Sequence, residues 1–232
     1  MLYMNEEKIP QCIGFIMDGN RRFAKRKGLS TLEGHAHGYE QLKKIVNCVY
    51  DAHIPHMVCY AFSTENWKRT EEEVGYLMRL LEKAIREFPN LLAREGKQAN
   101  IRVIGERTHL PSTLQNAISE MEEKNVKNSK FTVWIALSYG GRAEIVSAVN
   151  QAVQNGAPIT EETFAELLWT KGMPDPDLVI RTSGEQRISN FLLWQSAYSE
   201  FFFVDTLWPD FGEFEFQSIL EEYAKRQRRR GA

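Results

Sequence analysis

The sequence predicts an α/β protein built on a mainly parallel, doubly wound sheet of six strands that is flanked by helices. Short apolar runs rich in Val, Ile and Phe alternate along the chain with longer segments of helical spacing. The runs show little polar alternation, as expected for strands buried on both faces. Because no linker, repeat or low-complexity segment divides the 232 residues, we predict one domain over residues 1–232, with flexible tails at 1–10 and 226–232.

The predicted strands are apolar runs enriched in β-branched and aromatic residues. They are CIGFIM (12–17), HMVCYAF (56–62), ANIRVIGE (99–106), FTVWIALSY (131–139), DLVIRT (177–182) and FFFVDTL (201–207). Each run is short enough to be a strand, and helical segments separate them, so parallel crossover connections are expected.

Helical spacing marks the segments between these strands. In residues 39–52 the apolar side chains Leu42, Ile45 and Val49 share one face. From Glu71 onward apolar residues keep helical spacing as far as Phe88, and Pro89 is predicted to kink or end that helix. Further helices are predicted over residues 111–124, 141–154, 160–169 and 214–230.

Composition excludes several classes of protein. A net charge of -2 argues against a general nucleic-acid binder. The three cysteines lack metal-ligand spacing, which favours reduced thiols in a cytoplasmic protein. The sequence contains neither a long uninterrupted apolar run nor a signal peptide. We therefore expect a cytoplasmic protein whose membrane contact is at most peripheral.

Basic and polar residues follow four predicted strands, over residues 18–22, 63–69, 140–142 and 181–189. In doubly wound sheets ligands bind beyond the carboxyl ends of the strands. Arg side chains bind phosphate oxygens through two parallel hydrogen bonds, and Gly lets backbone N–H groups approach them. The pattern predicts a diphosphate site in which Asp18 holds Mg²⁺. Taken alone, DGN is also typical of a turn, and Asp18 of a helix cap.

Several longer motifs resemble those of one family, the cis-prenyltransferases of the undecaprenyl diphosphate synthase type. The matching blocks are IMDGNRRFAKRKG with GHAHG, YAFSTENWKR, SYGGRAEI, and DLVIRTSGEQRISNFLLWQSAYSEFFFVDTLWPDF, and they span nearly the whole chain. The resemblance implies a Mg²⁺-dependent enzyme, usually a homodimer. It would condense isopentenyl diphosphate with an allylic diphosphate such as farnesyl diphosphate, giving a polyprenyl diphosphate of the undecaprenyl type for a cell-wall lipid carrier.

The resemblance also implies roles for individual residues. Asp18 and Asn66 are expected to be catalytic, and Asp18 and Glu200 to hold Mg²⁺, with Glu200 reaching in from the side of the other subunit. The expected substrate-binding residues are Gly19, Asn20, Arg21, Arg22, Phe23, His35, Ser63, Glu65, Trp67, Arg69, Arg181, Arg187 and Ser189.

A growing polyprenyl chain needs an apolar tunnel, which we expect between the sheet and the helix that begins near Glu71. The candidate wall residues are Val74, Leu77, Leu81, Ile85 and Phe88 on the helix, and Val58, Ala61, Val103, Ile135 and Leu137 on the strands. Without the resemblance these would be read as core residues. The small side chain of Ala61 favours a long product. The basic run at 226–230 is either a site for anionic lipids or a solvated tail.

Two departures from the family pattern concern the allylic substrate. Arg21 stands where bacterial members usually have Gly, and Thr31 where the family usually has an Arg that contacts the allylic diphosphate. Arg21 could supply the charge that Thr31 lacks. A short- or medium-chain synthase of specialised metabolism, or a non-catalytic partner subunit, are the alternative functions.

Overall fold

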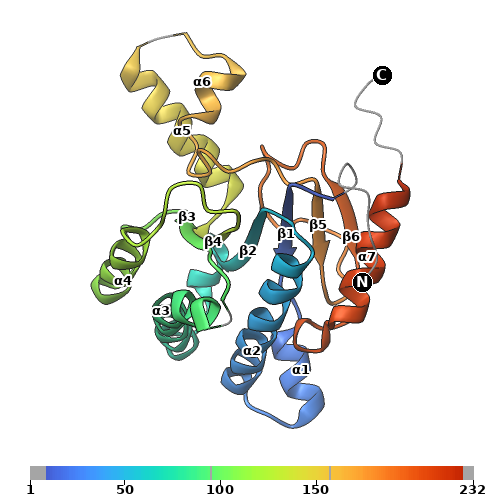
Figure 1. The fold of residues 1–232 in the computed structure, drawn as a ribbon. Coiled ribbons are helices and arrows are strands. Elements are labelled where there is room, and N and C mark those ends of the chain that lie inside the picture. Colours follow the sequence, from blue (N-terminus) through green and yellow to red (C-terminus); the bar gives the residue numbers. More distant parts are fainter. Residues whose placement is uncertain (1–8, 95, 157, 227–232) are drawn as a thin grey trace.

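One parallel sheet organises the computed structural model, which describes residues 9–94, 96–156 and 158–226 (Figure 1). Every neighbouring pair of strands is parallel, and the order across the sheet is β3-β4-β2-β1-β5-β6. The strands are β1 (Cys12–Ile16), β2 (His56–Ser63), β3 (Asn100–Ile104), β4 (Thr132–Tyr139), β5 (Leu178–Arg181) and β6 (Glu200–Phe203). The predicted fold class is confirmed, and each predicted strand is present.

The helices fill the connections between strands. They are α1 (Asn20–Lys27), α2 (Thr31–Asp51), α3 (Glu71–Arg94), α4 (Ser112–Glu122), α5 (Gly141–Asn155), α6 (Glu161–Ala165) and α7 (Glu213–Lys225). Two short 3₁₀ helices, η2 (Thr64–Lys68) and η3 (Trp208–Asp210), join them. In Figure 1, α5 and α6 extend away from the other helices.

The two faces of the sheet are covered differently. On one face, α2, α3, α4 and α7 pack apolar side chains such as Ile45, Ile85 and Leu220 against the strands. The other face packs largely against the long segment between α6 and β6, through residues such as Met173 and Phe191. Ligand-sized space is therefore expected mainly on the helical face, between strands and helices.

Three helices differ from their predicted extents. α2 begins at Thr31 rather than near residue 39, because Ser30 and Glu33 form a capping box at its start. Pro89 does not end α3, which continues to Arg94 because Leu92 is buried beyond the proline and offsets the lost hydrogen bond. α6 stops at Ala165, short of the predicted residue 169.

The chain order creates a topological switch point beside β1. From β1 the chain goes to β2 on one side, and after β4 it crosses to β5 on the other side. The rule for open parallel sheets places a ligand in the crevice beyond the carboxyl ends of these two strands. Asp18 and Arg181 lie at that crevice.

Two further expectations concern the flexible tails and the contact with a membrane. The predicted tails lie outside the described residues except for Ile9, Pro10 and Arg226; Ile9 packs on the core and Pro10 is buried. Arg226 pairs with Glu200, and the rest of the basic run falls outside the described residues. Within residues 9–94, 96–156 and 158–226, no helix combines the length and apolarity that crossing a membrane requires.

Candidate active site

Asp18 and Arg181 form an ion pair at the switch point. Arg181 ends β5 in register with Ile16 of β1, and its Nη2 donates to Asp18 Oδ2 at 3.0 Å. The Thr182 hydroxyl donates to the Asp18 carbonyl at 2.6 Å. The Arg181 side chain is 4% exposed and its Nε has no hydrogen-bond partner among the described residues, whereas Asp18 is 37% exposed. The pair thus combines a buried cation with an unused donor and a carboxylate that a ligand can reach.

The N-terminus of α1 points to the same crevice, directly after Asp18. Its N-cap, Gly19, has φ 113°, and a Cβ there would come within 3.0 Å of Leu207. Glycine is therefore required for the turn that starts α1 so close to the strand. The first N–H groups of a helix lack partners within it and carry partial positive charge, which makes this end a site for an anion.

Arg22 extends this site toward the loop after β5. Its guanidinium donates to the Ser183 carbonyl at 2.9 Å and also to the Ser183 hydroxyl, and it lies 3.7 Å from Asp18 and 3.6 Å from Glu185. The charges of Arg22 and Arg181 therefore lie on either side of the Asp18 carboxylate.

A second basic group is built on the segment after β5. Arg181 Nη1 donates to Ser189 Oγ at 2.7 Å and to the Arg187 carbonyl at 2.5 Å. The Arg187 side chain is 60% exposed and pairs with Glu185 at 2.6 Å. Ser189 has a positive φ of 48°. Through these bonds Arg181 holds the segment after β5 against its own side chain, and Arg187 lies on the solvent side of the crevice.

A buried polar network around Glu144 holds the segment after β5 in place. Glu144 on α5 is fully buried and accepts hydrogen bonds from the Tyr139 hydroxyl at 2.5 Å, from the backbone and side chain of Thr170, and from Gln195. These bonds tie β4 and α5 to the segments before and after β5.

Three basic side chains predicted at the site gather on one acid that was not predicted. Glu73 on α3 accepts hydrogen bonds from Arg21, from His35 Nε2 at 3.0 Å and from Arg69 Nη1 at 3.1 Å. Burial lowers the pKa of His35, against the opposing effect of the Glu73 hydrogen bond, so the imidazole is held mostly neutral. Arg21 therefore turns toward Glu73, not toward Thr31.

The 3₁₀ helix η2 carries the remaining predicted residues. Asn66 Oδ1 accepts a hydrogen bond from the Ser63 N–H at 3.1 Å, and Glu65 Oε1 accepts one from Asn190 at 2.9 Å. Trp67 Nε1 donates to Ser138 Oγ at 3.0 Å. The last two bonds join η2 to the segment after β5 and to the end of β4.

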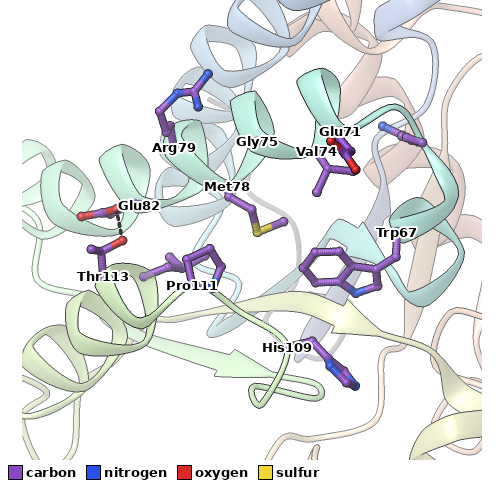
Figure 2. Close-up of a pocket in the computed structure, with 12 residues that line it drawn as sticks. Trp67, Glu71, Val74, Gly75, Met78, Arg79, Glu82, His109, Pro111 and Thr113 are labelled. Atoms are coloured by element: carbon purple, nitrogen blue, oxygen red, sulfur yellow. Dashed lines mark hydrogen bonds between the residues drawn. The ribbon is translucent and has the colours of Figure 1, made fainter.

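A cavity of about 490 Å³ lies on the outer side of Trp67, between α3 and the segment before α4 (Figure 2). Figure 2 shows Met78 and Trp67 across from Pro111 and His109, with the Glu82–Thr113 hydrogen bond at the end away from Trp67. Val74, predicted to line the tunnel, faces this cavity instead. Trp67 therefore lines this cavity, while the hydrogen bond from its indole nitrogen to Ser138 holds η2 against β4.

A second, apolar cavity of about 100 Å³ lies between the sheet and helices α2 and α3. It begins near the crevice at Met17, Asn20 and His35. Of the predicted tunnel residues, the cavity is lined by Ala61, Leu77, Leu81, Ile85, Phe88 and Ile135. Val58 packs on the opposite face of the sheet, since alternate residues of a strand point to opposite faces. Val103 and Leu137 belong to the core of the helical face without lining the cavity.

The other predicted residues separate into two groups. Gly19, Asn20, Arg22, Arg181, Arg187 and Ser189 lie with Asp18 at the crevice between β1 and β5. Phe23 is buried and packs its ring against His37. Glu200 starts β6 opposite Leu178, at the far end of the strand from Arg181, and pairs with Arg226. Within one chain Glu200 is therefore not brought to Asp18, and its predicted metal role would need another subunit.

The donor set suits one ion in particular. Among the described residues no cluster of three or more His, Cys, Asp or Glu side chains could enclose a metal ion. Asp18 offers a single, reachable carboxylate next to an anion site. Mg²⁺ is typically bound by one or two carboxylates, substrate phosphates and water, so Asp18 fits a metal that arrives with a diphosphate.

The chain is similar to several known proteins over nearly its whole length. The family model "Putative undecaprenyl diphosphate synthase" matches residues 16–231. An isoprenyl transferase of Fusobacterium nucleatum is 46% identical over 228 residues, with 97% of each chain covered. A ditrans,polycis-undecaprenyl-diphosphate synthase of Micrococcus luteus, (2E,6E)-farnesyl-diphosphate specific, is 43% identical, covering 98% of this chain and 94% of that one. The crystal structure of lavandulyl diphosphate synthase from Lavandula x intermedia with dimethylallyl diphosphate has a TM-score of 0.93 at 36% identity, covering 98% and 100%.

Proposed function

Since the chain belongs to the undecaprenyl diphosphate synthase family of prenyltransferases, we propose that it condenses isopentenyl diphosphate with farnesyl diphosphate to make an undecaprenyl-type polyprenyl diphosphate for cell-wall lipid carrier synthesis. The observation that carries the proposal is the Asp18–Arg181 pair, set between the N-terminus of α1 and the mouth of the apolar cavity. An anionic head and an apolar tail of one substrate fit these two neighbouring features. We place the enzyme in the cytoplasm, where its apolar product requires transfer to a membrane surface.

Each part of the crevice has a role in the proposed reaction. The allylic diphosphate binds the N–H groups of α1 and Arg22, with its prenyl chain directed past His35 into the apolar cavity. Isopentenyl diphosphate binds Arg187, Ser189 and the unused donor of Arg181. The isopentenyl double bond attacks the allylic C1 as the C1–O bond breaks. The new carbon–carbon bond forms, diphosphate leaves, and a proton passes to a diphosphate oxygen or to water held by Asn66.

The arginines and Asp18 contribute most where charge develops. The leaving diphosphate gains negative charge as the C1–O bond breaks, so Arg22 and the dipole of α1 bind it more strongly in the transition state than in the ground state. Asp18 would hold Mg²⁺, which neutralises diphosphate charge when bound. Trp67 and Asn66 on η2 cover this region and could exclude water.

The proposal is tested by incubating the purified protein with Mg²⁺, labelled isopentenyl diphosphate and one of several primers, and sizing the products by chromatography. We expect condensation with farnesyl diphosphate and a series of longer products. The absence of condensation with every primer would reject the catalytic role and support the non-catalytic partner subunit.

A short- or medium-chain synthase is the second candidate, and two observations favour it. One similar structure is a lavandulyl diphosphate synthase in complex with dimethylallyl diphosphate. The apolar cavity of about 100 Å³ has room for only about three water molecules at ~30 Å³ each, much less than a long prenyl chain needs. A long product therefore requires α2 and α3 to move apart, whereas a short one requires less movement.

Tyr39 is predicted to limit product length, because it lines, with Leu80, both the apolar cavity and an outer groove between α2 and α3. The side chain is 8% exposed, and its hydroxyl donates to Glu87 across the two helices at 3.3 Å. We expect Tyr39→Ala to open the cavity toward this groove and to shift the chromatographic profile by one or more isoprene units. Tyr76→Ala, which alters the outer groove alone, is the control. An unchanged profile for Tyr39→Ala would contradict the prediction.

We also propose a homodimer that covers α5. Val146, Val149 and Val153 lie on one side of this helix and are 59%, 42% and 73% exposed. An apolar stripe of this kind is typical of an interface. We expect Val146→Asp combined with Val153→Asp to raise the dimer dissociation constant by roughly 30-fold or more, measured by sedimentation. Val126→Asp, at an exposed valine outside α5, should leave it unchanged. Equal dissociation constants for both variants would place any interface elsewhere.

A further inference from the structure

The hydrogen bonds between Arg21 and Glu73 have the geometry with which an arginine binds a phosphate group. Arg21 Nε donates to Oε1 of Glu73 at 3.1 Å, and Arg21 Nη2 donates to Oε2. This pairing of two parallel hydrogen bonds is also how a guanidinium binds a phosphate. While Glu73 holds it, that edge of the Arg21 side chain is unavailable to a diphosphate.

The charges at this cluster do not cancel. Burial alone would raise the pKa of Glu73, but the hydrogen bonds from Arg21 and His35 and the charges of Arg69 and Arg21 outweigh it and lower that pKa. Glu73 is therefore ionised, while His35 is mostly neutral. Arg21 and Arg69 both face the Glu73 carboxylate, and Arg69 lies close enough to Asp18 for their charges to interact. The cluster keeps a net positive charge beside the crevice.

Arg21 can leave Glu73 without unfolding the helix that carries it. Its side chain is 55% exposed, whereas that of Glu73 is 6% exposed. Arg21 lies in the first turn of α1, on the helix whose N-terminus forms the anion site. A rotation of this one exposed side chain would therefore be enough to exchange the buried acid for a ligand in the crevice as the partner of the guanidinium.

We propose that Glu73 is a positioning residue. It binds Arg21 in the substrate-free enzyme and releases it when the diphosphate of the allylic substrate binds Arg21 instead. This inference rests on the proposed function, because it assigns that diphosphate to the crevice. Glu73 competes with the substrate for Arg21, so it weakens diphosphate binding. Arg21 then supplies the charge that Thr31 lacks only once the substrate has displaced Glu73.

The test compares Glu73→Gln with wild type by calorimetric titration of farnesyl diphosphate with Mg²⁺, and by steady-state kinetics. Without the competing charge we expect the dissociation constant and KM for farnesyl diphosphate to fall about three- to tenfold, with kcat within about threefold. Glu72→Gln, which removes the same charge from an exposed neighbour in the same turn, should change neither constant. In an Arg21→Ala background the gain from Glu73→Gln should shrink.

Two results would overturn the proposal. Unchanged affinity in Glu73→Gln would show that no competition exists. Weaker affinity, as in Arg21→Ala, would show that Glu73 orients Arg21 for the substrate. Inorganic diphosphate serves as a second probe, so a wild-type protein that binds it without condensing prenyl groups would reject the proposed function and still test this inference. Binding of neither probe rejects both.

Wild-type protein provides a check that needs no folded variant. In crystal structures with and without bound diphosphate, the Arg21 guanidinium should pair with the ligand in the first and with Glu73 in the second. Arg21 paired with Glu73 in both structures would reject the exchange.

Discussion

Asp18→Ala should lower kcat/KM for condensation about a thousandfold. The substitution removes the carboxylate that pairs with Arg181 beside the α1 N-terminus and that we propose as the Mg²⁺ ligand. Charge developing on the leaving diphosphate would then lack its metal anchor. The measurement is product formation from labelled isopentenyl diphosphate and farnesyl diphosphate at saturating Mg²⁺.

The fold should survive this change, which separates chemistry from stability. Asp18 is 37% exposed, and Arg181 keeps its hydrogen bonds to Ser189 and the Arg187 carbonyl. We expect a cooperatively folded protein whose melting temperature is lowered by a few degrees, because the buried Arg181 loses its ion-pair partner. Asp210→Ala is the matched control, because Asp210 pairs with Arg26 near the C-terminus of α1, the helix that follows Asp18. Activity within about threefold of wild type for Asp18→Ala would refute the assignment.

Glu144→Ala should lower the free energy of unfolding by about 3–4 kcal/mol, because it leaves several buried donors unpaired. The Tyr139 hydroxyl, Gln195 and both the N–H and hydroxyl of Thr170 bind this carboxylate. Activity should fall as well, since the network supports the segment that bears Arg187. Urea unfolding measures the first effect and the KM for isopentenyl diphosphate the second.

The matched control for this prediction is Glu166→Ala. Glu166 and its partner Lys171 are both 62% exposed, and such pairs contribute little to stability. We expect a change within about 0.5 kcal/mol. A similarly small change for Glu144→Ala would mean that water or a rearranged side chain satisfies the buried donors.

The crevice could be predicted from the sequence because a parallel sheet gathers the residues after its strands at one edge. Asp18 and Arg181 directly follow or end buried strands, so their proximity depends only on the strand assignment. The family resemblance then added His35. The strand pattern likewise predicted all six strands of the sheet. The predicted helices differed from the structure at ends such as those near Thr31 and Pro89, and they did not include α1.

Contacts made by helix side chains could not be predicted in the same way. Glu73 reads as one more acid in a first turn that begins EEE, and only the packing of α3 against α1 and α2 buries it under Arg21 and His35. Glu144 likewise looks like a solvated helix residue until β4 and the segment before β5 close over it. A single polar position on the buried face of a helix was the available signal for both residues.

The parallel sheet also has a consequence for how this site comes into being during synthesis. Asp18 and its partner Arg181 are separated by 163 positions along the chain, and β5 can join β1 only after the whole intervening chain has been made. A nascent chain therefore carries Asp18 next to its local partner Arg22 long before Arg181 is available to pair with it. Such long-range pairing is typical of slow folding. Because the anion site exists only in the completed sheet, substrate binding should stabilise the folded state as a whole.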